Sequence, residues 1–169
     1  MFYVIQVKTK TEKKFLDLSS QLIERLGLNI FWPRRNLRIR KKGKWQDTLT
    51  PIFPGYLFIN IDKISTEIYW GFKKIPGFFR FLKNNHNITP LSGPEAEIFR
   101  KIIRFGEIIE KSIVTFKEDN KIHVIEGPLK GLEGIIIKVD KRKGRAKVKL
   151  DLYNQSYLVD FGFQSISNK

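Results

Sequence analysis

The sequence predicts an α+β fold for the N-terminal part of the chain and an all-β fold for the C-terminal part. Up to about residue 106, strand-like apolar runs alternate with segments whose apolar residues recur at helical spacing. From about Lys117 on, short alternating runs separated by turn residues follow one another. These patterns favour an RNP/ferredoxin-like antiparallel sheet with helices, followed by a small SH3-like barrel.

The segment Pro51–Ile61 is the centre of the N-terminal part. Pro54 and Gly55 predict a tight turn, because proline presets its own φ angle and glycine accepts angles that other residues avoid. The residues after this turn are mostly β-branched or aromatic and predict a buried strand. Phe53 and Tyr56 flank the turn, and they belong either to the core or to an aromatic docking pocket.

The remaining N-terminal elements follow from periodicity and capping signals. Phe2–Val7 predicts a first strand, and Asn29–Pro33 predicts a short second one. A capping box of Thr9 and Glu12 is expected to open the first helix, which ends at Gly27. Further signals predict a helix capped by Ser65, a strand over Phe78–Leu82 and a helix opened by Ser92 and Glu95.

Four short strands are predicted in the C-terminal part: Lys121–Glu126, Leu132–Val139, Arg145–Leu152 and Ser156–Phe161. The third alternates strictly, with apolar residues on one face and charged residues on the other. We therefore expect a first domain at residues 1–106, a linker at 107–117 and a second domain at 118–169.

The charge balance points to an anionic partner. The 169 residues include 32 Lys and Arg against 17 Asp and Glu, a net charge of +15. The chain has no cysteine and two distant histidines, so we expect no enzyme activity, no metal site and no cofactor. The apolar runs are shorter than the roughly 20 residues that span a bilayer. We expect a cytoplasmic protein, a monomer, without a membrane partner.

Two clusters of cations without an intervening acid are candidates for nucleic-acid binding. An ordinary solvated surface is the alternative for both, and Trp45 beside the first cluster either stacks on a base or anchors the loop to the core. The first cluster is expected on a mobile loop or hairpin, and the second on a hairpin turn and one outward strand face. The candidates are Arg34, Arg35, Arg38, Arg40, Lys41, Lys42 and Lys44, then Lys141, Arg142, Lys143, Arg145, Lys147 and Lys149.

Three stretches in this order resemble the NusG family of transcription elongation factors: FYVIQVKTKTEKK, IFPGYLFINI with IPGFFRFL, and HVIEGPLKGLEGIIIKVDKRKGRAKVKL. The last of them resembles the KOW motif. The segments RIRKKGKWQ and PLSGPEAEIF are similar to the specialised antitermination branch of the family, LoaP. Phe2 is a departure, since the family more often has tryptophan there.

The resemblance implies that the N-terminal domain binds the clamp helices of RNA polymerase through an apolar concavity. The matching residues are Phe53, Pro54, Gly55 and Tyr56, with Phe58 beside them. Tyr69, Lys73 and Lys74 are weaker candidates for a contact with the non-template DNA strand.

For the C-terminal KOW domain the resemblance leaves alternatives open. The LoaP branch implies binding to nascent RNA, in particular a hairpin. The housekeeping branch implies contact with a ribosomal protein or with the termination factor Rho, for which Tyr153 matches an aromatic position. A ribosome-associated KOW protein without a polymerase role is the alternative from another class.

Overall fold

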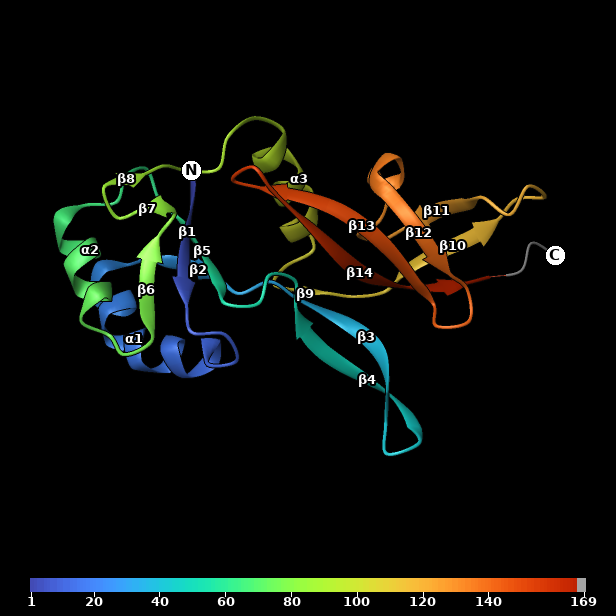
Figure 1. The fold of residues 1–169 in the computed structure, drawn as a ribbon, viewed down its shortest axis with the longest axis horizontal. Helices are drawn as coiled ribbons and strands as arrows, with labels where there is room; N and C mark the ends of the chain where they lie inside the picture. The colour runs from blue at the N-terminus through green and yellow to red at the C-terminus, as the bar shows by residue number, and fades with distance from the viewer. Residues whose placement is uncertain (167–169) are drawn as a thin grey trace. The chain divides into compact units, whose positions relative to one another are not determined.

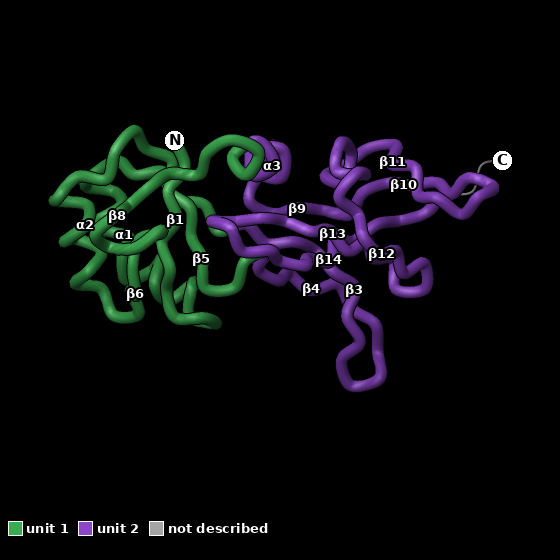
Figure 2. The backbone as a smooth tube through the Cα atoms, turned by 45° about the horizontal axis from the view of Figure 1, so that its top comes forward, with its two compact units in different colours: residues 1–32, 53–96 green, residues 33–52, 97–169 purple. Residues whose placement is uncertain are grey.

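The computed structural model describes residues 1–166 (Figure 1). The chain forms two compact units, and each is made of two separate segments of the sequence. Unit 1 comprises residues 1–32 and 53–96, and unit 2 comprises residues 33–52 together with the chain from residue 97 onward (Figure 2). The expected domain boundaries at 106 and 118 stay a prediction, and the last three residues of the second expected domain lie outside the described residues.

Unit 1 contains a four-stranded antiparallel sheet with the strand order β2-β5-β1-β6. The strands are β1 (Phe2–Val7), β2 (Asn29–Phe31), β5 (Tyr56–Asn60) and β6 (Phe78–Phe81). Helix α1 (Glu12–Leu26) follows β1, and helix α2 (Thr66–Lys73) follows β5, which gives the expected β-α-β-β-α-β order. A small hairpin of β7 (Lys83–Asn84) and β8 (Asn87–Ile88) comes after the sheet.

Both helices of unit 1 pack on the same face of this sheet (Figure 1). Alternate residues of β1 and β5 meet Phe15 of α1 and Ile68 and Phe72 of α2 in one buried cluster. The predicted caps at Ser65 and Gly27 are confirmed: the Ser65 hydroxyl accepts a hydrogen bond from the backbone amide of Ile68 at 3.2 Å, and Gly27 has a left-handed φ of 59°.

The predicted capping box of Thr9 and Glu12 is wrong. Helix α1 begins after Thr11, and the Glu12 carboxylate, only 3% exposed, accepts a hydrogen bond from the backbone amide of Gly55 at 2.7 Å. The amide of Val7 donates to the carbonyl of Gly55 at 2.8 Å. A β-carbon at Gly55 would lie 2.8 Å from the Thr9 hydroxyl, so only glycine fits here. The Pro54-Gly55 turn is therefore tied to both α1 and β1.

Unit 2 contains a five-stranded sheet with the order β11-β10-β14-β13-β12. Its strands are β10 (Ser112–Phe116), β11 (Ile122–Glu126), β12 (Ile136–Asp140), β13 (Arg145–Leu152) and β14 (Gln155–Ser165), and a 3-10 turn η1 (Glu133–Ile135) precedes β12. The expected alternation of β13 is confirmed, because Ala146, Val148, Leu150 and Leu152 are buried.

The same unit contains a three-stranded sheet with the order β4-β3-β9. Its strands are β3 (Arg34–Lys41), β4 (Lys44–Pro51) and β9 (Ile108–Ile109). Residues 107–117, the expected linker, contain β9 and β10, and β9 pairs in parallel with β3. Helix α3 (Gly93–Ile103) starts where the serine cap was expected.

We predict that Glu12→Ala lowers the free energy of unfolding by about 1–3 kcal/mol, because it leaves the buried amide of Gly55 without an acceptor. Glu12→Gln keeps an acceptor oxygen and should have a smaller effect. The measurement is urea unfolding followed by tryptophan fluorescence. Glu24→Ala, at an exposed position of the same helix, is the control, with a change within about 0.5 kcal/mol. Equal effects of Glu12→Ala and Glu24→Ala would contradict this account.

Candidate functional site

The first cation cluster lies on a regular hairpin and not on a loose loop. Strands β3 and β4 pair in register from Arg34 opposite Pro51 to Lys41 opposite Lys44. Lys42 and Gly43 form the two-residue turn, with φ angles of 48° and 79° that match the twist of a tight hairpin. Since side chains alternate, the cations divide between the two faces: Arg34, Arg38 and Arg40 on one, Arg35, Lys41 and Lys44 on the other.

Exposure separates the tip of this hairpin from its base. Arg38, Arg40, Lys41, Lys42 and Lys44 are exposed, whereas the side chains at the base are half-buried. The cations that can meet a polyanion are therefore concentrated toward the turn.

Arg35 connects the base of the hairpin to the rest of unit 2, and its role in nucleic-acid binding stays a prediction. Its guanidinium donates hydrogen bonds to the backbone carbonyls of Asp160 and Pro51. Burial lowers the pKa of Arg35 to about 10, while the carboxylate of Asp160 opposes this shift and the charge of Arg145 adds to it. Two of the five N–H donors of the guanidinium are thus used within the protein. Arg35 joins the hairpin to β14.

Trp45 is not buried in a core, which was one of the two interpretations that the sequence allowed. Its side chain is 37% exposed, and the guanidinium of Arg38 lies 5.5 Å from the centre of its ring. This cation–π pair leaves an aromatic surface beside the exposed cations.

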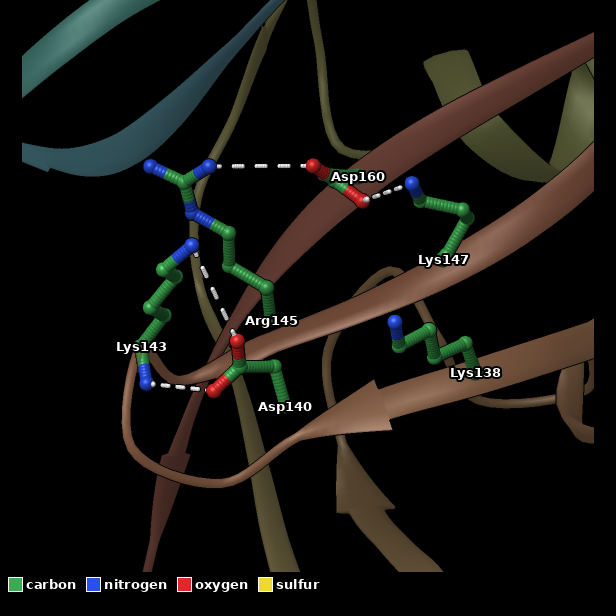
Figure 3. A pocket seen from close by; sticks show the side chains of 6 residues that line it. All are labelled: Lys138, Asp140, Lys143, Arg145, Lys147 and Asp160. Atoms are coloured by element: carbon green, nitrogen blue, oxygen red, sulfur yellow. Dashed lines mark hydrogen bonds and ion pairs between the residues drawn. The ribbon is translucent and has the colours of Figure 1, made fainter.

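The second cation cluster surrounds the β12–β13 turn and the outward face of β13, as expected (Figure 3). Two carboxylates partly offset it. Asp160 lies 3.7 Å from Arg145 and 3.9 Å from Lys147, and Asp140 lies 4.0 Å from Lys143.

The other members of this cluster are Lys141, Arg142 and Lys149, and Arg142 lies near enough to Asp140 to help lower the pKa of that carboxylate. Lys149 and Arg142 are exposed. The ammonium of Lys141 donates to the amide oxygen of Asn120 at 2.8 Å and lies 4.1 Å from the ring centre of Phe116. Backbone hydrogen bonding from Lys143 lowers the pKa of Asp140, so this carboxylate stays ionised at neutral pH.

The residues expected to bind polymerase are divided between core and surface. Phe53 is 4% exposed and Phe58 is fully buried, with their ring centres 5.7 Å apart. The expected open apolar hollow is thus filled by these two rings. Pro54 is exposed and Tyr56 is half-buried, so these two residues present the surface of the turn, above the fixed backbone of Gly55.

The second face of the unit 1 sheet is also apolar. Phe2 and Val4 of β1 lie on it, opposite the face that carries the two helices. The Phe2 ring meets Phe31 edge-on at 5.8 Å, and the amide of Leu91 donates to the carbonyl of Phe2 at 2.7 Å. Phe53 and Phe58 extend this apolar face toward the Pro54-Gly55 turn.

The weaker candidates on α2 form an aromatic and basic patch with a residue that sequence analysis missed. The ammonium of Lys73 lies 4.5 Å from the ring of Trp70 and 5.6 Å from that of Tyr69. Trp70 is 49% exposed, and Lys74 is exposed beside it. A tryptophan outside the buried stripe of α2, three residues before a lysine, was the signal that could have identified it.

Tyr153 lies where it was expected, in the turn between β13 and β14. It and Asn154 both have positive φ angles, of 50° and 64°. The Tyr153 side chain is half-buried.

Two further features of the described part of the chain concern metal sites and membrane spans. Within residues 1–166, no group of three or more His, Asp or Glu side chains could hold a metal ion. None of the helices described there is long and apolar enough to cross a membrane.

We predict that Arg35→Ala lowers the free energy of unfolding by about 1–3 kcal/mol, since two partly buried carbonyls lose their donor. Arg35→Lys should also destabilise, because one ammonium replaces a fork that reaches two acceptors. Arg40→Ala, on the exposed part of the same strand, is the control, with a change within about 0.5 kcal/mol. Urea unfolding measures all three, and a neutral Arg35→Ala would refute the anchoring role.

The sequence and the fold are both similar to those of known proteins. The NusG family profile, described as "Transcription termination factor nusG", matches residues 1–100. The chain is 25% identical over 179 aligned positions to the transcription termination/antitermination protein NusG of Borreliella burgdorferi, covering 98% of this chain and 96% of that protein. The NusG of Bacillus subtilis is also 25% identical, over 174 positions and the same shares of both chains.

A solved structure described as "Domain interaction in Thermotoga maritima NusG" has a similar fold. It superposes with a TM-score of 0.61 at 21% identity, covering 95% of this chain and 92% of that one. Because the family profile covers more than half of the sequence, the chain belongs to the NusG family of transcription termination and antitermination factors.

Proposed function

We propose that this protein is a processive antitermination factor of the LoaP kind, which holds RNA polymerase with one part and nucleic acid with another. The observation that carries the proposal is the pair of cation clusters presented on two well-formed hairpins of unit 2. Like charges concentrated in this way repel one another unless a polyanion is bound. No covalent chemistry is required, and the protein would act in the cytoplasm.

The proposed contact with polymerase is the Pro54-Gly55 turn of unit 1. Pro54 and Tyr56 would touch the clamp helices, while Phe53 and Phe58 support them from below. The bond from Gly55 to Glu12 fixes the turn before any partner arrives, which limits the entropy lost on binding. A bound factor that favours the closed clamp would make pausing and termination rarer. Tyr69, Trp70 and Lys73 of α2 would meet the non-template DNA strand.

The proposed contact with nucleic acid uses the exposed cations of both hairpins, with residues 118–169 as a KOW domain and residues 1–106 as the N-terminal domain. An RNA hairpin recognised by shape is the expected ligand, since the cations would bind phosphates and carry no pattern for reading bases. The half-buried Tyr153 in its turn favours a second candidate function, coupling of polymerase to a ribosomal protein or to Rho. A ribosome-associated protein without a polymerase role is the alternative that the first experiment below separates.

We predict that Tyr56→Ala weakens binding to purified RNA polymerase by ~2 kcal/mol, about thirtyfold, because a few aromatic anchors carry most of such an interface. Biolayer interferometry with the immobilised full chain measures the affinity. Leu18→Ala, at an exposed apolar position of α1, is the control and should change affinity less than twofold.

Phe53→Ala should destabilise unit 1 as well as weaken binding, since it empties a buried site. Its unfolding curve is therefore measured beside its affinity. An unchanged affinity of Tyr56→Ala would rule out the turn as the polymerase contact and favour the ribosomal alternative.

We also predict that affinity for an RNA hairpin falls steeply with salt and depends on the hairpin tip. The double variant Arg40→Ala/Lys41→Ala should lower the slope of log K against log salt by about 1–2, because about 0.7–0.9 counterions are released per neutralised phosphate. Lys14→Ala/Lys130→Ala removes the same charge at exposed positions elsewhere and should leave the slope nearly unchanged. Fluorescence anisotropy across a salt series gives both slopes. Equal slopes for the two double variants would mean that net charge alone, and not this hairpin, attracts RNA.

A further inference from the structure

A hollow with a volume of about 330 Å³ lies within unit 2, where four segments of the chain meet. Arg38 of β3 lines it, together with the 141–144 turn between β12 and β13 and the residues 163–165 at the end of β14. Lys111, just before β10, completes the lining. Its size is within the usual range for small-ligand sites. Segments more than 100 positions apart in the sequence thus contribute cations to one concave surface.

The charge of this hollow differs from that of its neighbour. The smaller pocket of Figure 3, about 120 Å³, includes Asp140 and Asp160 in its lining, and these carboxylates lie within 4.0 Å of its Lys and Arg side chains. Among the described residues, the larger hollow is lined by cations and polar groups without a carboxylate: Arg38, Lys111, Lys141, Arg142, Lys143, Gln164 and Ser165. Lys111 is offset by Asp47 at 2.7 Å and Lys143 by Asp140 at 4.0 Å, and Arg38, Lys141 and Arg142 give the hollow its remaining positive charge.

The walls of the hollow are held in place by hydrogen bonds that do not use its cations' side chains. Arg145 donates to the backbone carbonyl of Arg38 at 2.6 Å, which connects β13 to the hairpin. The amide of Phe163 donates to the carbonyl of Gly144 at 2.8 Å. A β-carbon at Gly144 would lie 2.8 Å from the Phe163 carbonyl oxygen, and its φ is 63°, so glycine is required for this close approach.

We propose that this hollow binds a single phosphate group of a nucleic-acid backbone, held jointly by Arg38 from one hairpin and by Lys141, Arg142 and Lys143 from the other. The inference rests on the proposed function, since it names the site at which unit 2 would bind a phosphate of its nucleic acid. Guanidinium groups bind phosphate through two parallel hydrogen bonds, and the ammonium groups add point charges. A phosphate seated here fixes the register of the strand across both hairpins, whereas cations on a flat surface would allow it to slide.

The test is a double-mutant cycle on the full chain, with an RNA hairpin as the probe and anisotropy as the readout. Arg38→Ala and Arg142→Ala are both at exposed positions, and the first keeps the backbone carbonyl that Arg145 uses. Each single variant should weaken binding by about three- to tenfold. The loss of affinity in the double variant should be about threefold smaller than the product of the two single losses, because both side chains bind the same phosphate. In the control pair, Arg38→Ala and Lys130→Ala, the loss of affinity in the double variant should equal the product of the two single losses.

A second readout is the NMR spectrum of the protein during titration with inorganic phosphate. The backbone amide signals of Gly144 and Ser165 should shift saturably in the unmodified protein, and the shifts should vanish in both single variants. Repeating the cycle with a DNA duplex in place of the RNA hairpin shows which nucleic acid binds here. A non-multiplicative effect of Arg38→Ala and Arg142→Ala with either probe supports the site.

The outcomes separate this inference from the function beneath it. Multiplicative effects of Arg38→Ala and Arg142→Ala without phosphate-induced shifts would overturn the shared site, while nucleic-acid binding by unit 2 would stand. An unmodified protein that binds neither RNA nor DNA would overturn both.

Discussion

The anchoring of the β3–β4 hairpin by Arg35 is the constraint on which the proposed nucleic-acid surface of unit 2 depends. Arg35 bonds a carbonyl of β14 and one at the end of β4, and its burial next to Asp160 holds the base of the hairpin against the five-stranded sheet. Gly162 of β14 permits this approach, since a β-carbon there would lie 2.8 Å from the carbonyl oxygen of Asn36. Because the base is fixed, Arg38 has a defined position beside the cations of the β12–β13 turn.

A comparable hydrogen bond connects distant segments of unit 1. The carboxylate of Glu12 lies at the first turn of α1, where a negative charge is favourable, and it accepts the amide of Gly55. This bond sets the turn before β5, and β5 in turn pairs with both β1 and β2. One carboxylate therefore connects the helix layer to the segment that we propose as the polymerase contact. The same turn is a local structural requirement and a surface for a partner, so substitutions there need a stability control.

Much of the fold could be predicted from the sequence, because local patterns determine it. The alternation of β13, the helical spacing in α1 and α2 and the signals at Ser65 and Gly27 are confirmed. What escaped prediction depends on contacts between distant residues. Glu12 has the spacing of a capping box, but its carboxylate accepts a hydrogen bond from Gly55. Arg35 belongs to a run of seven cations in the sequence, but its guanidinium donates to a backbone carbonyl inside the protein. The strands β9 and β10 are short and pair with partners far along the chain, so the region 107–117 gave the pattern of a linker. Burial was one of the two interpretations that the residues allowed for Phe53, and the exposure of Trp70 was not anticipated.

The central claim is that this member of the NusG family acts on transcription through polymerase and nucleic acid together. Affinity capture of the tagged full chain from cells, with identification of the co-purifying proteins and RNA, tests it most directly. The account predicts RNA polymerase subunits together with a restricted set of transcripts, the latter released by raised salt. Recovery of ribosomal proteins and ribosomal RNA without polymerase would contradict it.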